Sequence, residues 1–321
     1  MLCQYCQSPT KRFGHTSDGR QRYRCLTPTC RKITAEARER VLPGIKVPDQ
    51  RALMVLQLLC EGASVRAVER LTGTEKRTIL RLLRLAGEAC ERMLSEQVRG
   101  VEVADVECDE IWGYVHCKEA TKKRKGIQNP EAGDTYTFTA IDRESKLLLA
   151  FQVGRRSTYE AHDFMAKLAT ATAGDFQVST DAWTGYPETI EYNLGARVSY
   201  GMVVKEFAPP PADEVRRYGP PRLRRCEKVA VYGSPDEERM GTSRVERSNW
   251  TIRTHLRRMT RLSNGFSRKR ANLRANLALF FAYYNFVKIH RSIRMTPAMK
   301  AGIARAPWSM ADLLNAAKKA A

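Results

Sequence analysis

Four cysteines near the start of the chain limit how its first segment can fold. They form two close pairs, Cys3-x2-Cys6 and Cys25-x4-Cys30, with 18 residues between the pairs. A module of about 35 residues is too small to bury an adequate apolar core, and a metal ion can supply the missing stability. Each pair can present two thiolates from a tight turn to one tetrahedral zinc ion. We therefore predict a zinc ribbon over residues 1–37 with these four ligands; a vacant site, or His15 in place of one cysteine, is the alternative.

The composition indicates a folded protein whose partner is a polyanion. Hydrophobic residues make up 43% of the 321, which is enough to build a core, and the net charge is +20. Nucleic acid is the first partner that such a charge suggests, and an anionic membrane surface is the second. The sequence has no run of about 18 apolar residues and no signal-peptide core at its start. We expect a cytoplasmic, nucleoid-associated protein with no membrane partner.

The charge is unevenly distributed along the chain. Residues 1–100 carry a net charge of +9, residues 101–200 carry −5, and residues 201–321 carry +16. A carboxylate-rich segment between two basic ones suits an enzyme that acts on phosphodiesters, because cations can hold DNA while carboxylates hold metal ions. Uneven solvation of an ordinary surface is the alternative.

Residues 48–98 are expected to form a helix-turn-helix domain that binds DNA. Apolar residues recur at helical spacing from Leu53 to Leu85, and Gly73 lies where the turn needs a left-handed backbone. Thr74 is the expected N-cap of the second helix, whose start would enter the major groove. The side chains expected in the core are Val68, Leu71, Ile79 and Leu82, and those expected to contact DNA are Lys76, Arg77 and Arg81. An ordinary helical hairpin with a basic solvated face is the alternative.

From residue 101 to residue 300 the pattern predicts an α/β domain with a mixed sheet. The expected strands are 101–115, 135–142, 146–153 and 176–180, and a helix is expected at 158–171. Successive strands followed by a helix and another strand favour a mixed sheet flanked by helices. Prolines predict an irregular insertion near 204–240, helices are expected from Thr242 onward, and residues 301–321 are expected to be an alanine-rich C-terminal tail.

The first of these strands carries several carboxylates. They are Asp105, Glu107, Asp109 and Glu110. Alternation along a strand places residues 105, 107 and 109 on one side, and Asp181 follows the strand 176–180. If the two strands adjoin, two carboxylates converge, and such hard oxygen ligands suit Mg²⁺ or Mn²⁺ in phosphoryl transfer. Solvated strand ends are the alternative.

A third acid stands in a very basic segment. Between residues 241 and 270 there are nine basic side chains, and Glu246 is the only acid. A single carboxylate amid so much positive charge favours a functional role. However, Ser243-x-x-Glu246 also fits a capping box, in which the glutamate closes the start of a helix. The residues alone do not choose between these two interpretations.

Together, these motifs resemble the bacterial insertion-sequence transposases with a DDE triad, and among them the insertion-sequence-one group. The resemblance spans roughly residues 3 to 305. It is carried, besides the helix-turn-helix, by Arg22-Tyr-Arg-Cys25 with Cys30-Arg-Lys32, Asp109-Glu-Ile-Trp-Gly-Tyr114, Thr180-Asp-Ala-Trp183, Arg244-Val-Glu-Arg-Ser-Asn249, the segment 257–269, and Tyr284-Asn-Phe-Val-Lys-Ile-His-Arg-Ser292 with Thr296-Pro297.

The resemblance implies a ribonuclease-H-like core with the first aspartate on the central strand, the second on a neighbouring strand, and the glutamate on a helix. It thereby identifies Asp109, Asp181 and Glu246 as the catalytic residues and as ligands of Mg²⁺ or Mn²⁺. The implied activity is cleavage at the terminal repeats of a mobile element and transfer of the 3′-OH into target DNA by a dimer or higher oligomer. Phosphate contacts are expected from residues that follow Glu246 at helical spacing, namely Asn249, Arg253 and Arg257.

The chain departs from the family pattern in two places. The interval from Asp181 to Glu246 is longer than in compact members, and the second cysteine pair is wider. Two other functions fit the same motifs. One is a DNA-binding regulator that uses the zinc ribbon and helix-turn-helix without catalysis. The other is a ribonuclease-H-like nuclease or resolvase that cuts structured DNA without joining it to a target.

Overall fold

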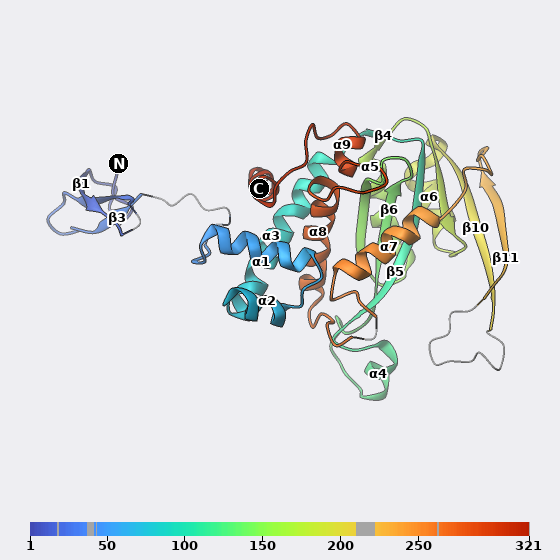
Figure 1. Ribbon diagram of the computed structural model, residues 1–321, viewed down its shortest axis with the longest axis horizontal. Coiled ribbons are helices and arrows are strands. Elements are labelled where there is room, and N and C mark those ends of the chain that lie inside the picture. Colours follow the sequence, from blue (N-terminus) through green and yellow to red (C-terminus); the bar gives the residue numbers. More distant parts are fainter. Residues whose placement is uncertain (18, 37–41, 43, 210–221, 262, 321) are drawn as a thin grey trace. The chain divides into compact units, whose positions relative to one another are not determined.

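The structure is a computed structural model that describes residues 1–17, 19–36, 42, 44–209, 222–261 and 263–320 (Figure 1). The chain divides into two compact units, an N-terminal unit, Met1–Pro43, and a main unit, Gly44–Ala321. The helix-turn-helix and the sheet, which the sequence suggested as separate domains, therefore lie in one compact unit. Among the described residues, no helix combines the length and the apolar character needed to cross a membrane.

The N-terminal unit is a small antiparallel sheet. Its strands are β1 (Thr10–His15), β2 (Gln21–Cys25) and β3 (Ile33–Ala35), with β2 in the centre. The apolar side chains of Leu2, Tyr5 and Leu26 are exposed, whereas Cys3 and Cys25 are buried. The cysteines, and not an apolar cluster, therefore form the centre of this unit, as expected for a module of this size.

The main unit is built on a six-stranded mixed sheet in the order β11-β10-β9-β5-β6-β7. The strands are β5 (Asp105–Val115), β6 (Gly133–Asp142), β7 (Leu148–Gly154), β9 (Phe176–Asp181), β10 (Val198–Ala208) and β11 (Arg222–Tyr232). β5, β6 and β7 are antiparallel, β9 is parallel to both β5 and β10, and β11 is antiparallel to β10. The predicted mixed sheet is confirmed, and β5, with the cluster of acids, lies inside it.

The prediction of an irregular insertion near 204–240 is wrong for much of that range. Residues 198–208 and 222–232 form β10 and β11, which pair along almost their whole length and extend the sheet. The prolines at 210, 211, 220 and 221 lie outside the described residues. Because β11 is an edge strand with no buried side chain, its sequence does not show the alternation that identifies a half-buried strand.

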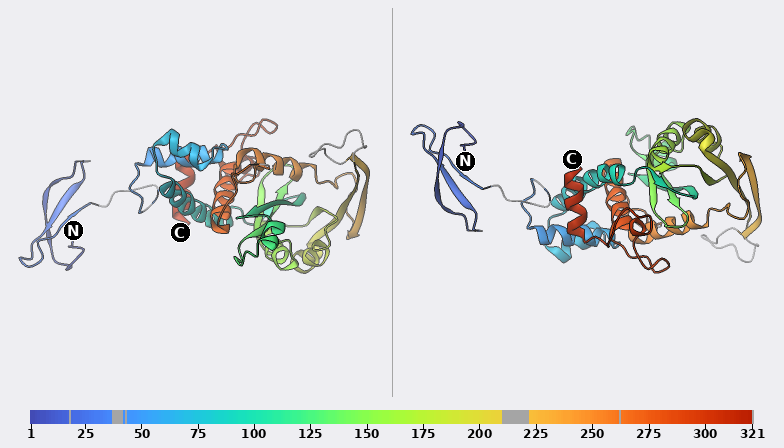
Figure 2. Two further views of the ribbon diagram at one scale, coloured as in Figure 1. Left: turned by 90° about the horizontal axis from the view of Figure 1, so that it is seen from below. Right: turned by 90° about the horizontal axis from the view of Figure 1, so that it is seen from above.

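Helices cover both faces of the sheet. α5 (Thr158–Ala171), which matches the predicted helix, packs with α6 (Tyr186–Leu194) on one face, and α7 (Ser243–His255) packs on the other face against β5 and β6. Figure 2 shows the sheet between these helices. The remaining short elements are β4 (Val101–Glu102), β8 (Thr172–Ala173), α4 (Glu119–Arg124), the 3₁₀ helix η1 (Gly195–Arg197) and α9 (Pro297–Lys300).

The other helices pack together at one end of the main unit. They are α1 (Asp49–Cys60), α2 (Val65–Thr72), α3 (Lys76–Gln97), α8 (Arg270–Phe286) and α10 (Met310–Lys319). The segment expected as a C-terminal tail thus contains a helix, which a Ser309–Asp312 capping box begins and whose apolar side packs against α3. A capping box followed by apolar residues at helical spacing is typical of a helix. The many alanines in this segment make that spacing hard to recognise in the sequence.

The turn between α2 and α3 has the predicted backbone conformation, but two side chains near it do not have their predicted roles. Gly73 ends α2 with a φ of 64°, and Val68, Ile79 and Leu82 are fully buried. The predicted N-cap is wrong, because Glu75 accepts the hydrogen bond from the amide of Thr78 at 3.2 Å. Leu71, expected in the core, is 68% exposed.

α3 and α8 approach each other closely at Gly87. A Cβ atom placed on it would lie 2.1 Å from the carbonyl oxygen of Ala275, so the two backbones touch there. We predict that Gly87→Ala destabilises the main unit by several kcal/mol, although alanine is normally favoured over glycine inside a helix by about 1 kcal/mol. Urea unfolding measures the change, with Glu96→Ala on the exposed side of α3 as the control. Equal or greater stability of Gly87→Ala would contradict this helix contact.

Candidate active site

Two aspartates lie at the same level of adjacent strands. Asp109 is on β5, and Asp181 is the last residue of β9, which runs parallel to β5. The register pairs Asp105 with Gln177 and Glu107 with Ser179, so the aspartates are the next residues on the same face of the sheet. The carboxylates of Asp109, Glu110 and Asp181 offer ligand atoms that all lie within 4.8 Å of one another.

Glu246 approaches this pair from helix α7. Its carboxylate contacts Lys205 of β10 and accepts a hydrogen bond from Thr242 at 2.9 Å. Burial, together with the negative charges of Asp181 and Glu246, raises the pKa of Asp109 to about 7. The three acids expected from the resemblance therefore lie close enough to interact electrostatically.

The capping box suggested for Glu246 is not formed. α7 begins at Ser243, its N-cap is Thr242, and no side chain of the helix caps it. Instead, Glu107 of β5 accepts hydrogen bonds from the amides of Arg244 at 2.7 Å and Val245 at 3.0 Å. A buried carboxylate at a helix N-terminus satisfies free amides and interacts favourably with the helix dipole. Glu107 thus fixes the turn that carries Glu246.

The neighbouring acid Asp105 also has a structural partner. Its carboxylate accepts a hydrogen bond from Nε of Arg239 at 2.9 Å and forms an ion pair with the same guanidinium. The sequence alone had left Asp105, Glu107 and Asp109 as equal candidates. Since Asp105 and Glu107 are occupied by Arg239 and by α7, Asp109 is the member of this set that faces Asp181 and Glu246.

Two of the expected phosphate contacts have partners inside the protein. Asn249 is 8% exposed; its Nδ2 donates to Asp109 at 2.6 Å, and its Oδ1 accepts from Thr139 at 3.3 Å. Arg253 donates to the carbonyl groups of Trp112 and Met259 at 2.9 and 3.0 Å, and burial lowers its pKa to about 10. Both side chains join α7 to the surrounding structure. Arg257, the third, is exposed.

Glu110 was not selected from the sequence, because alternation places it on the face of β5 opposite Asp109. Its side chain is only 2% exposed and pairs with Arg156 at 3.3 Å, and Arg156 also lies 3.5 Å from Asp181. Burial, with the charge of Asp181, raises the pKa of Glu110 to about 7. The β5–β9 ladder ends at Glu107–Ser179, so beyond this point carboxylates from both faces can meet. The place where the pairing of β5 with β9 ends is therefore the only signal that Glu110 can reach the cluster.

The carboxylate cluster fits a divalent cation. Several acidic oxygens converge where their mutual repulsion and burial raise pKa values, and a bound cation relieves both effects. Carboxylate oxygens are the ligands that Mg²⁺ and Mn²⁺ prefer. Asp109, Glu110 and Asp181 form the compact part of this set, and Glu246 lies beside it on α7.

The four cysteines of the N-terminal unit also converge. Their sulfur atoms lie within 4.8 Å of one another, with Cys3 and Cys30 3.8 Å apart and Cys6 and Cys25 3.4 Å apart. Hydrogen bonds with Ser8 and Cys25 lower the pKa of Cys6 to about 6, whereas burial and hydrogen bonds with the other three cysteines raise that of Cys30, so the first thiolate forms at Cys6. The predicted set can hold a metal ion without His15, which is exposed on β1.

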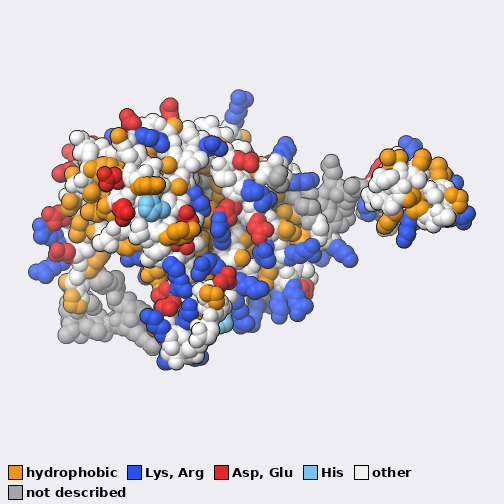
Figure 3. Space-filling view, turned by 180° about the vertical axis from the view of Figure 1, so that it is seen from behind, with side chains coloured by type: hydrophobic (Ala, Val, Ile, Leu, Met, Phe, Trp, Pro, Cys, Tyr) orange, Lys and Arg blue, Asp and Glu red, His pale blue; other side chains and the backbone are white. Residues whose placement is uncertain are grey.

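The basic residues expected to contact DNA are available at the start of α3. Lys76, Arg77 and Arg81 are exposed there. Figure 3 shows one face of the molecule, where Lys and Arg side chains gather along the lower part of the main unit. These positions allow contact with a polyanion.

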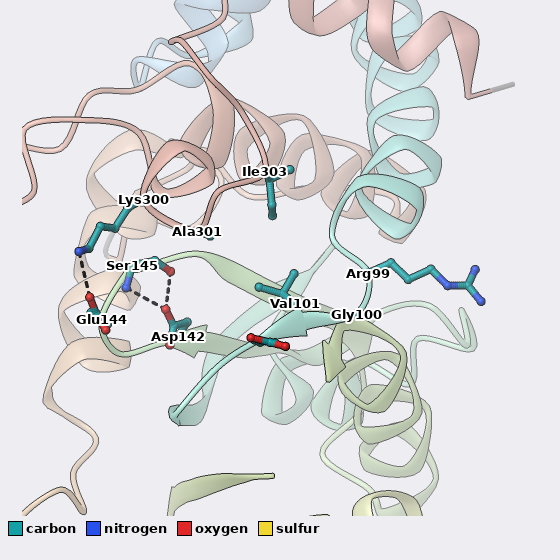
Figure 4. Close-up of a pocket in the computed structure, with 10 residues that line it drawn as sticks. Arg99, Gly100, Val101, Asp142, Glu144, Ser145, Lys300, Ala301 and Ile303 are labelled. Carbon is teal, nitrogen blue, oxygen red and sulfur yellow. Dashed lines mark hydrogen bonds and ion pairs between the residues drawn. The ribbon is translucent and has the colours of Figure 1, made fainter. Parts of the chain in front are cut away.

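A pocket of about 480 Å³ lies apart from the carboxylate cluster and shares no residue with it. Figure 4 shows that Lys300 pairs with Glu144, at 2.9 Å, and that Ser145 donates to Asp142 beside it. These four polar residues of the pocket thus bind one another in pairs.

No protein-family model and no curated protein matches the sequence. Among solved structures, the chain is similar to a chain of the piggyBac transposase synaptic complex with hairpin DNA. The identity is 8%, the TM-score is 0.36, and the match covers 85% of this chain and 71% of that chain. These values are too low to assign a function.

We predict that Asp109→Asn stabilises the main unit when no divalent cation is added. The carboxylate ionises near pH 4 in the unfolded chain but near pH 7 in the folded one, so its contribution to stability falls as the pH rises between these values. The variant should therefore melt several degrees higher at about pH 8, and the difference should shrink toward about pH 4. Mg²⁺ should raise the melting temperature of the wild type and of Asp175→Asn, an exposed control, but not that of Asp109→Asn. An equal magnesium effect on all three would contradict the cation site.

We also predict that the N-terminal unit needs zinc to fold. The purified protein should contain one zinc ion per chain, and Cys25→Ser should lose it, because three thiolates hold the ion less tightly than four. Elemental analysis and proteolysis of the N-terminal unit measure the two effects. Cys226→Ser, which changes an exposed thiol, should keep the metal. A stable, metal-free N-terminal unit would contradict the prediction.

Proposed function

We propose that the protein is a DNA transposase of the DDE type, with Asp109, Asp181 and Glu246 as its catalytic residues. The observation that carries this proposal is the juxtaposition of Asp109 and Asp181 on the adjacent strands β5 and β9, with Glu246 of α7 near enough to raise the pKa of Asp109. An acid on an inner strand, an acid on the neighbouring strand and a glutamate on a helix are the arrangement that a ribonuclease-H-like core implies. The similarity to the insertion-sequence-one group belongs to the same proposal.

The side chains around the carboxylates would hold them in place for the reaction. Asn249 orients Asp109, Glu107 fixes the start of α7, and Arg156 and Lys205 supply positive charge beside Asp181 and Glu246. When bound, Mg²⁺ or Mn²⁺ would supply the Lewis acid that activates a water or a 3′-OH and stabilises the leaving oxygen. Arg156 and Lys205 lie where they could also contact the phosphate that reacts.

The other parts of the chain would bind the DNA. The exposed basic start of α3 would read the terminal repeats in the major groove, and the N-terminal zinc ribbon would add a second contact. Because transposition joins two ends of an element, at least a dimer is expected. Target DNA is the second substrate.

Strand transfer tests this proposal. The purified protein is incubated with Mg²⁺, a plasmid and labelled duplexes that carry the sequences flanking its gene. We expect joined product from the wild type and from the control Glu96→Gln, and at least a hundredfold less from Glu246→Gln, because a neutral amide is a weaker cation ligand. Specific binding without cleavage would favour the regulator, and cleavage of structured DNA without joining would favour the nuclease or resolvase.

A further inference from the structure

The outer ends of β10 and β11 extend beyond the rest of the sheet. β9 pairs with β10 only as far as Asp181 and Val203. After this point β10 pairs with β11 alone, through residues 204–208 and 222–227, which we call the outer strand pair. Figure 1 shows the two strands at the edge of the sheet. Since no third strand among the described residues pairs with it there, the outer strand pair can meet a partner.

The outer strand pair is basic. Its cations are Lys205, Arg222, Arg224 and Arg225, and its acids are Glu206 and Glu227. Charges on an edge strand also prevent sheets from joining edge to edge, so basic residues alone do not indicate a ligand. However, the need to keep an edge strand from pairing with another sheet does not explain why large apolar side chains are exposed at the same place.

Two such side chains lie opposite each other. Phe207 and Leu223 are cross-strand partners, and each is 55% exposed. Both stand among the basic residues, so together they present an apolar surface bordered by positive charge. This combination matches a single-stranded or distorted nucleic acid, in which bases offer flat apolar faces between phosphates.

The apolar pair faces the same side of the sheet as the candidate active site. Lys205 contacts Glu246, and Phe207 follows Lys205 by two residues on β10. The pairing is irregular between Glu206 and Phe207, but the extra residue lies on β11, so side chains continue to alternate along β10. Phe207 therefore points to the side of α7. Lys205 and Phe207 are separated by about 7 Å along β10, a length that corresponds to roughly two stacked nucleotides.

We propose that the outer strand pair holds the reacting DNA strand, with Phe207 and Leu223 against a base about two nucleotides from the phosphodiester at the carboxylates. Arg224, which follows Leu223 on β11, contacts an adjoining phosphate. The aromatic ring replaces a stacking neighbour of the base, so the strand can leave the duplex geometry beside the site. This inference rests on the proposed function, because it needs DNA at the carboxylate cluster.

Binding of a fluorescent strand tests the inference without requiring catalysis. The probe is a short oligonucleotide with one 2-aminopurine, used single-stranded and annealed to its complement, in buffer with Ca²⁺. We expect the wild type to change the emission of the probe. Phe207→Ala should abolish this change and weaken single-strand binding at least fivefold, and Phe207→Trp should restore both, because its ring can also stack.

Two further variants separate stacking from charge and from folding. Tyr192→Ala, which removes an 80% exposed aromatic ring from α6, should behave like the wild type. Arg224→Gln should weaken binding of both probes and lower the salt dependence of the binding constant by about one phosphate contact. Unchanged melting temperatures would show that these exposed substitutions leave the fold intact.

The outcomes distinguish the inference from the proposed function. If Phe207→Ala binds and perturbs the probe like the wild type, the inference is wrong, while strand transfer by the wild type would still support the transposase. If the wild type binds neither probe, the inference is wrong and the proposed function loses its substrate. Loss of the emission change in Phe207→Ala alone, with its return in Phe207→Trp, would support the stacking contact.

Discussion

The buried carboxylate of Glu107 is the contact on which the rest of the site depends. Glu107 lies on the inner strand β5, and its carboxylate accepts hydrogen bonds from the backbone amides of Arg244 and Val245 at the start of α7. Further along, Asn249 of α7 binds Asp109, and Arg253 binds the carbonyl of Trp112. Helix and strand are thus joined by hydrogen bonds at successive levels, each of which uses groups that would otherwise be buried without partners. This attachment places Glu246 over β5, although the helix and the strand lie far apart in the sequence.

Charge balance is the second constraint on the same region. Asp109 and Glu110 are half-buried acids whose pKa values are raised to about 7, and Asp181 and Glu246 add negative charge beside them. Arg156 pairs with Glu110 and Asp181, and Lys205 pairs with Glu246. These cations offset part of the repulsion between the acids. A fold that keeps such a cluster near its centre stores unfavourable electrostatic energy at a site where a divalent cation can release it.

Much of the scaffold could be predicted from local patterns. The helix 158–171 and the strands around 133–142 and 176–181 follow from periodicity, because each buries one face or both against the same core. β11 could not be predicted in this way, since an exposed edge strand owes its conformation to backbone pairing with β10. Leu71 and Thr74 show the same limit at smaller scale, because exposure and capping there depend on how α2 and α3 meet.

The sequence by itself determined the chemical inventory: four cysteines spaced for one metal ion, a strand rich in carboxylates, and a lone glutamate in a basic segment. Spacing determines these features because thiolates in tight turns and alternating strand residues have fixed geometry over a few residues. Only the tertiary structure decided which acids converge. It assigned Glu107 and Asp105 to structural partners, turned Asn249 inward to Asp109, and brought Glu110 to the cluster from the opposite face. Those choices depend on where a ladder ends and on how a helix docks across a sheet, and both are set by contacts between residues that are far apart in the chain.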